Sequence, residues 1–150
     1  MNTRCGLCVL TVALAGLAAA PMACQSGGAG GSSDMVSKAM SALPSNIKDS
    51  ATRYISKYTD LNKMLGGLTN SGQAREALPR LEQTVGSMEN DARVLNGAPA
   101  DVRGNVKTAY GSQLDSLTKG LDHQVSRLMG NKDISSIVKP VLDRVPKLSL

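Results

Sequence analysis

The stretch ATRYISKYTDLNKML, residues 51–65, decides the fold. Its apolar residues recur at alternating spacings of three and four positions, which is the period of one face of an α-helix. Polar and charged residues fill most of the other positions, so we expect an amphipathic helix with one face in the core. The apolar stripe continues to Leu68 and consists of Ala51, Tyr54, Tyr58, Leu61, Leu65 and Leu68.

Upstream of this stretch, the same helical phase is interrupted by a proline. The apolar residues that hold the phase are Val36, Met40, Leu43 and Ile47. Proline inside a helix removes one hydrogen bond and kinks the helix. The sequence therefore leaves two alternatives: one helix from Asp34 to about Leu65 that kinks at Pro44, or a helix that restarts at Ser45. Gly66-Gly67 ends the helix in both.

A second helix is predicted between cap residues near Asn70 and a stop at Asn96-Gly97. Gln73 follows Asn70 by three positions, which is the spacing of a reciprocal cap. The apolar phase survives Pro79, so we expect one kinked helix. Its stripe consists of Ala74, Leu78, Leu81, Val85, Met88, Ala92 and Leu95.

Two further helices follow. In the third, Pro99 suits the first turn, and Gly130-Asn131 marks the end. Its glycines weaken it and allow a break near Gly111. The fourth is predicted to be capped by Asp133, and Pro140 and Pro146 should make it short and bent. Its expected apolar face is Ile134, Ile137, Val138, Val141, Leu142, Val145 and Leu148.

These elements predict an all-α fold for residues 34–150. Short connections make successive helices antiparallel neighbours, so we expect an up-down bundle of three long helices plus a shorter C-terminal helix. The core must be mostly aliphatic, since the chain has three Tyr and no Phe or Trp. Four pairs of opposite charge at a spacing of four should lie on solvated faces: Asp49/Arg53, Glu76/Arg80, Glu89/Arg93 and Asp115/Lys119.

The amino terminus reads as a targeting segment. Arg4 precedes an apolar run from Leu7 to Ala20, about 14 residues long, whereas a transmembrane helix needs roughly 20. Residues 1–23 are therefore expected to form a signal peptide, which also contains Cys5 and Cys8. One alternative for cleavage is after Ala18-x-Ala20, which would give a secreted or periplasmic soluble protein. Pro21 after that site disfavours it.

The other alternative is cleavage between Ala23 and Cys24. The sequence AAAPMAC, residues 18–24, resembles the lipobox of bacterial lipoproteins. The resemblance implies that Cys24 is lipidated and becomes the mature N-terminus, anchored in the bilayer. Residues 24–33 are then the lipidated Cys and a flexible Gly/Ser tether, with a reach of roughly 15–18 Å. Gln25 is compatible with delivery to the periplasmic face of the outer membrane.

Two segments of the body carry a second resemblance. ALPRLE (77–82) and IVKPVLDRV (137–145) are similar to segments of an uncharacterised family of small exported helical-bundle proteins. The likeness extends over most of residues 60–148. It implies a helical bundle and export. It does not indicate an activity, because none is established for that family.

The body offers no set of catalytic residues in sequence. His123 is the only imidazole, and no Cys follows Cys24, so a zinc ligand set is missing and we expect no metal or cofactor. Ser87 and Ser112 lack the G-x-S-x-G form. The carboxylates Glu82, Glu89 and Asp91 are interpreted as surface groups. The formal net charge of +5 is too mild to indicate a nucleic-acid partner.

The sequence therefore predicts a membrane-tethered lipoprotein of the cell envelope. Its bundle is expected to act as a non-enzymatic interaction or structural module, with the bilayer and an unidentified envelope protein as partners. The alternative is a carrier or sensor that binds a small ligand or metal between its helices. For that alternative, the candidate groove residues are Tyr54, Tyr58 and Tyr110.

Overall fold

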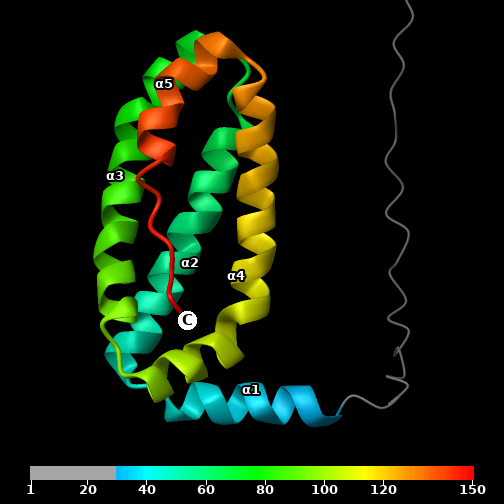
Figure 1. Ribbon diagram of the computed structural model, residues 1–150, viewed down its shortest axis with the longest axis vertical. Helices are drawn as coiled ribbons and strands as arrows, with labels where there is room; N and C mark the ends of the chain where they lie inside the picture. Colours follow the sequence, from blue (N-terminus) through cyan, green and yellow to red (C-terminus); the bar gives the residue numbers. More distant parts are fainter. Residues whose placement is uncertain (1–29) are drawn as a thin grey trace, which may run out of the picture.

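The computed structural model describes residues 30–150, which form helices and no strand. The helices are α1 (Gly30–Ala42), α2 (Ser45–Gly66), α3 (Ser71–Asn96), α4 (Ala100–Met129) and α5 (Lys132–Leu142). The predicted all-helical class is confirmed. Figure 1 shows α2, α3 and most of α4 as three long rods, with α1 across their lower end and α5 beside the upper part of α3.

A short break separates α1 from α2, so the first predicted helix restarts at Ser45 instead of continuing with a kink. Leu43 precedes a proline, and the proline ring crowds helical backbone at the preceding residue. Pro44 itself is extended, with φ −56° and ψ 147°, and caps α2. α1 begins at Gly30, ahead of the expected start at Asp34. It packs against α4.

The start of α3 is fixed by two side chains that satisfy each other's neighbouring backbone. Asn70 Oδ1 accepts a hydrogen bond from the N–H of Gln73 at 2.9 Å. Gln73 Oε1 accepts from the N–H of Thr69, also at 2.9 Å. From there α3 runs without a break through Pro79, as predicted, and ends at Asn96.

α4 is a continuous helix of 30 residues that begins directly after Pro99. Figure 1 shows that it bends: its first turns lie along α1, and the rest rises beside α2. The break near Gly111 that the sequence allowed does not occur, because α4 is helical from Ala100 to Met129. The pair Gly111-Ser112 is of the kind at which helices bend.

The cap of α5 differs from the prediction. Asn131, and not Asp133, is the N-cap, because its Oδ1 accepts from the N–H groups of Asp133 at 3.1 Å and Ile134 at 3.3 Å. Asp133 lies in the first turn, where its charge complements the helix dipole.

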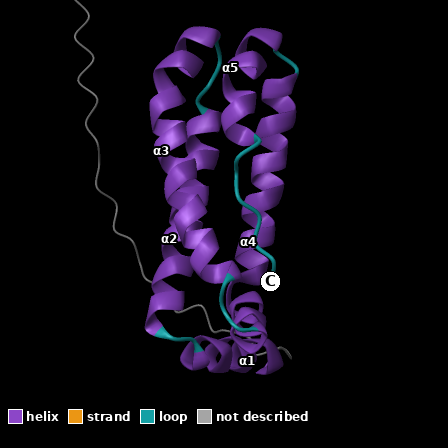
Figure 2. Cartoon of the chain, turned by 60° about the vertical axis from the view of Figure 1, so that its left-hand side comes forward, coloured by secondary structure: helices purple, strands orange, loops and turns teal. Residues whose placement is uncertain are grey.

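α5 ends at Leu142, so Val145 and Leu148 do not belong to a helical face as predicted. Pro146 explains the end, since it disfavours helical backbone at Val145 and supplies no N–H. Residues 143–150, called the C-terminal segment below, turn away from α5 and run along the bundle. Figure 2 shows this segment as a loop that descends from α5 beside the long helices.

α2 is the central helix of the bundle. It packs on both α3 and α4, and α5 packs on the same two helices. Within residues 30–150, no helix combines the length and hydropathy that spanning a bilayer requires. The core is aliphatic apart from tyrosine and methionine; its largest fully buried side chains are Tyr54, Leu61, Leu65, Leu81, Val85, Met88, Leu95, Val106, Leu128 and Val138.

Candidate functional site

Two of the predicted groove residues lie together on α2. Their spacing of four places Tyr54 and Tyr58 on one helix face, and their ring centroids are 5.8 Å apart at an interplanar angle of 51°. Both are buried. The Tyr54 hydroxyl donates a 2.6 Å hydrogen bond to the carbonyl oxygen of Pro146 in the C-terminal segment. The tyrosine pair therefore joins α2 to the end of the chain.

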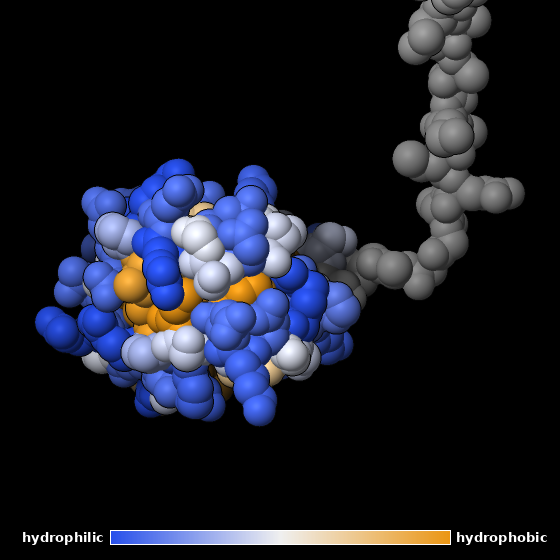
Figure 3. Space-filling view, turned by 90° about the horizontal axis from the view of Figure 1, so that it is seen from above, coloured by the Kyte–Doolittle hydropathy of each residue, from blue (hydrophilic) through white to orange (hydrophobic). Residues whose placement is uncertain are grey.

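A groove of about 810 Å³ opens above this pair. Tyr54 and Tyr58 contribute to its lining, α4 forms one wall, and the C-terminal segment forms another. The apolar lining residues are Leu114, Leu121, Val125, Leu142, Val145, Pro146, Leu148 and Leu150. The polar ones are Lys107, Asp115, Thr118, Asp122, Asp143 and Lys147. Figure 3, seen from the upper end of the bundle, shows apolar surface at the centre between hydrophilic side chains.

Tyr110 does not join the pair at the groove. It lies on α4 with its side chain buried in the core, and it is not among the residues that line the groove. The structure thus brings two of the three predicted residues to one groove and leaves the third in the packing of α4.

Burial raises the pKa of both groove tyrosines. For Tyr54 the main cause is loss of water around the hydroxyl, and the neighbouring Tyr58 adds to it. For Tyr58, burial is again the largest cause of the raised pKa. A hydrogen bond with Thr118 lowers this pKa in part, and the nearby charge of Asp122 raises it. Both hydroxyls therefore stay protonated at neutral pH, and that of Tyr54 acts as a hydrogen-bond donor.

The C-terminal segment is held by side chains that bond to its backbone. Asn96 Nδ2 donates to the carbonyl oxygen of Lys147 at 3.1 Å, and Asn96 Oδ1 accepts from the N–H of Ser149 at 2.8 Å. Arg103 Nη1 donates to the carbonyl oxygen of Ser149 at 2.9 Å. Tyr54 lies on α2, Asn96 on α3 and Arg103 on α4. Three helices therefore form hydrogen bonds to one stretch of extended chain.

Side chains of the segment alternate between the bundle and solvent. Pro146, Leu148 and Leu150 are half-buried, whereas Lys147 and Ser149 are exposed. A period of two is the pattern of extended chain with one face against a protein surface. This site was not predicted from the sequence, because Asn96 also fits a helix stop and Val145 and Leu148 also fit the spacing of a helical face. The alternation after Pro146 was the available signal.

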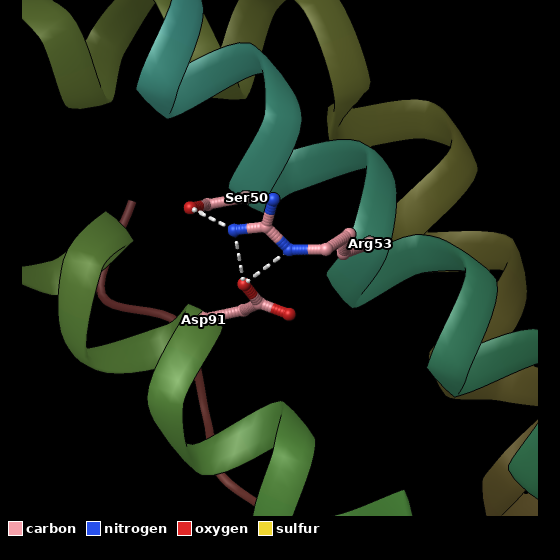
Figure 4. Close-up of polar contacts among 3 residues, drawn as sticks. All are labelled: Ser50, Arg53 and Asp91. Atoms are coloured by element: carbon pink, nitrogen blue, oxygen red, sulfur yellow. Dashed lines mark hydrogen bonds and ion pairs between the residues drawn. The ribbon is translucent and has the colours of Figure 1, made fainter.

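The buried Asp91 lies at the seam between α2 and α3. It was interpreted as a surface group, but it is only 7% exposed. Figure 4 shows Arg53 of α2 reaching Asp91 and Ser50. Arg53 Nε and Nη2 contact Asp91 Oδ1 at 3.0 and 2.9 Å, and Nη2 also donates to Ser50 Oγ at 3.0 Å.

None of the four predicted pairs along single helices forms among residues 30–150. Arg53 pairs with Asp91 and not with Asp49, and Glu89 pairs with Arg144 of the C-terminal segment at 3.1 Å. Of the eight residues in these pairs, only Arg53 and Glu89 form an ion pair in the described part of the chain, each with a neighbouring element. The one pair at a spacing of four in this part of the chain is Lys139–Asp143, with the base first.

A second hollow, of about 420 Å³, lies on the same seam between α2 and α3. Its charged lining residues are Lys57, Asp60, Lys63 and Arg80, and its neutral ones are Met64, Gln83, Thr84 and Ser87. Within residues 30–150, its three cations form no ion pair. The hollow is therefore cationic and polar, in contrast to the apolar groove at the tyrosines.

The remaining candidates for chemistry are dispersed. His123 and Ser112 are exposed on α4, and Ser87 Oγ donates to the carbonyl oxygen of Gln83. Glu82 and Glu89 line neither hollow. In the part of the chain that the structure describes, no three His, Cys, Asp or Glu side chains gather in a way that could hold a metal ion.

Comparisons of the chain with protein-family models, with curated proteins and with solved structures found no match. The resemblance of residues 77–82 and 137–145 to exported helical-bundle proteins therefore stays a prediction. Cys24 and the signal peptide lie outside the described residues, and so does the tether up to residue 29.

Proposed function

We propose that this chain is a lipoprotein of the cell envelope whose helical body acts by binding another envelope protein. The observation that carries the proposal is the order of features in one sequence: an apolar run after Arg4 of the length of an export signal, the lipobox-like Ala23-Cys24, a short Gly/Ser-rich stretch, and a helical body. Lipid at Cys24 holds the body at a membrane, which Gln25 suggests is the periplasmic face of the outer membrane.

The arrangement that we propose for the body is the up-down bundle, extended by α1. Short connections between α2, α3, α4 and α5 support it, since they favour reversal of the chain between neighbouring helices. In this arrangement, α1 lies between the tether and the long helices, and the groove faces away from the seam of α2 with α3.

Replacement of Cys24 tests the tether. In the native host, wild-type protein is expected in the membrane fraction, and Cys24→Ser in the soluble fraction, because the lipid is attached through the cysteine sulfur, which serine lacks. Cys8→Ser is the matched control, since it makes the same substitution within the expected signal peptide. If Cys24→Ser fractionates with membranes as wild type does, the tethering proposal fails.

A second candidate function is a carrier or sensor of a small apolar ligand. The groove of about 810 Å³ beside Tyr54 and Tyr58 favours it, because its volume falls within the range of small-molecule sites and its walls are mostly apolar. Native mass spectrometry of protein purified from its host tests this function. A co-purifying small molecule supports it, and protein of bare mass counts against it.

A further inference from the structure

The hydrogen bonds that hold residues 146–149 do not depend on the side chains of these residues. Tyr54, Asn96 and Arg103 all bond to backbone atoms, namely the carbonyl oxygens of three residues and one N–H. Every peptide in the same extended conformation presents these groups at the same spacing. The three helices therefore form a surface that reads extended backbone.

Asn96 is the most specific of these contacts. Its amide donates to the carbonyl oxygen of Lys147 and accepts from the N–H of Ser149, two residues further on. This two-sided contact matches an extended chain and no helical one, since a helix uses the same backbone groups internally. Asn96 thus selects an extended conformation for the segment that it binds.

The apolar core beside this surface sets the side-chain preference. Pro146, Leu148 and Leu150 are half-buried, and the two leucines pack against the core, whereas Lys147 and Ser149 are exposed. The preferred peptide has apolar residues at alternate positions and polar residues between them. The site also has a hydrogen-bond donor that the C-terminal segment does not use: Arg103 Nε is buried without a hydrogen-bond partner in the described part of the chain.

We propose that the surface formed by Tyr54 of α2, Asn96 of α3 and Arg103 of α4 is a binding site for an extended peptide with apolar residues at alternate positions, and that residues 145–150 occupy it in cis. The inference rests on the proposed interaction role, for which it names the kind of partner. A partner segment binds by displacing the C-terminal segment, using the same contacts to Tyr54, Asn96 and Arg103.

Occupation in cis sets how strongly a free peptide competes. A segment tethered directly to α5 has an effective concentration on the order of millimolar. A free peptide with the sequence of residues 145–150 is therefore expected to bind the wild-type chain at least about ten-fold more weakly than a chain whose own segment is weakened.

The experiment titrates that blocked six-residue peptide, VPKLSL, into the isotope-labelled full chain and follows backbone amide shifts by NMR. The weakened chain carries Leu148→Ser and Leu150→Ser, and Leu150→Ser alone is the milder variant if the double variant loses helicity. We expect shifts at the amides around Asn96 and Arg103, with tighter binding to the weakened chain than to wild type. Addition of Asn96→Ala should remove binding, whereas Asn90→Ala, on an exposed position of α3, should not.

Three results would overturn the proposal. They are no amide shifts in a weakened chain that keeps its helical content, equal affinity for weakened and wild-type chains, and full binding after Asn96→Ala. A peptide with Ser at both leucine positions should bind at least about ten-fold more weakly, and equal binding would contradict the apolar preference. The titration needs no membrane, so it can fail while the Cys24 experiment succeeds, and the reverse.

Discussion

At the scale of single residues, Arg53 shows how a charged side chain joins two helices. It contacts the buried Asp91 and also Ser50, while its own side chain is 58% exposed. Removing Arg53 leaves a buried carboxylate without its partner, because Asp91 makes no other side-chain ion pair in the described part of the chain. The pair therefore matters more for α2 and α3 than an exposed pair on one helix would.

We predict that Arg53→Ala lowers the free energy of unfolding by about 1–3 kcal/mol, the range for hydrogen bonds to charged groups. The control is Arg75→Ala on α3, an exposed arginine, which should change it by less than about 0.5 kcal/mol. Urea unfolding followed by circular dichroism measures both. Equal effects of the two substitutions would show that the contact with Asp91 does not stabilise the fold.

The raised pKa values of the buried tyrosines make the free energy of unfolding depend on pH. The hydroxyl of Tyr54 ionises at its ordinary pKa of 10.0 in the unfolded chain and at a higher pKa in the folded one. Above about pH 10 the unfolded state loses this proton first, so the free energy of unfolding falls as pH rises. Below pH 10 both states are protonated, and this contribution is constant.

Tyr54→Phe isolates that contribution. The variant should lose about 0.5–1.5 kcal/mol at neutral pH, because it lacks the hydrogen bond to Pro146. Its stability should then decline less steeply than that of wild type above pH 10, and Tyr58 accounts for part of the decline that remains. Urea unfolding between pH 8 and pH 11 provides the test, and parallel pH profiles for the two proteins would contradict it.

At the scale of elements, the cap of α5 distinguishes the sequence-based expectation from the observed contact. Asn131 Oδ1 accepts from two backbone N–H groups, and Asp133 makes no such contact as a cap. We predict that Asn131→Ala lowers the free energy of unfolding by about 1 kcal/mol, whereas Asp133→Ala costs only the dipole effect of about 0.3–1 kcal/mol. Thermal unfolding of the two variants measures the difference. A larger loss for Asp133→Ala would restore the original interpretation.

Which elements could be predicted follows from their local signals. The stripe of α2 and the cap of α3 are encoded within a few residues, so periodicity and the Asn70–Gln73 spacing were sufficient. The outcome at Pro44 was left open because a proline either kinks a helix or ends it, and packing of α1 against α4 accompanies the second outcome. The C-terminal segment was missed because its apolar residues also fit a helical spacing.

At the scale of the whole molecule, the groove depends on contacts that no local pattern contains. Tyr54 and Tyr58 could be paired from their spacing, but that Tyr110 lies apart from the groove follows only from how α4 packs. Asn96 and Ser149 lie 53 positions apart, and the hydrogen bonds to the carbonyl oxygens of residues 146–149 span 46, 51 and 92 positions. The predicted ion pairs within single helices were wrong for the same reason, because the observed partners of Arg53 and Glu89 belong to other elements.

The same scale joins the two proposals. A lipid at Cys24 would hold the body near a membrane. There, the surface formed by Tyr54, Asn96 and Arg103 would bind an extended segment of an envelope protein. Confinement to a membrane surface raises the effective concentration of the partner, which favours displacement of a segment bound in cis. The tether and the groove are therefore complementary, although each is tested on its own.

The most direct test of the central claim is the intact mass of the protein purified from its native host membranes. The account predicts the mass of a chain that begins at Cys24 and carries a lipid adduct, which alkaline hydrolysis reduces by the mass of ester-linked acyl chains. An unmodified chain that begins at Met1 or Pro21 would contradict it.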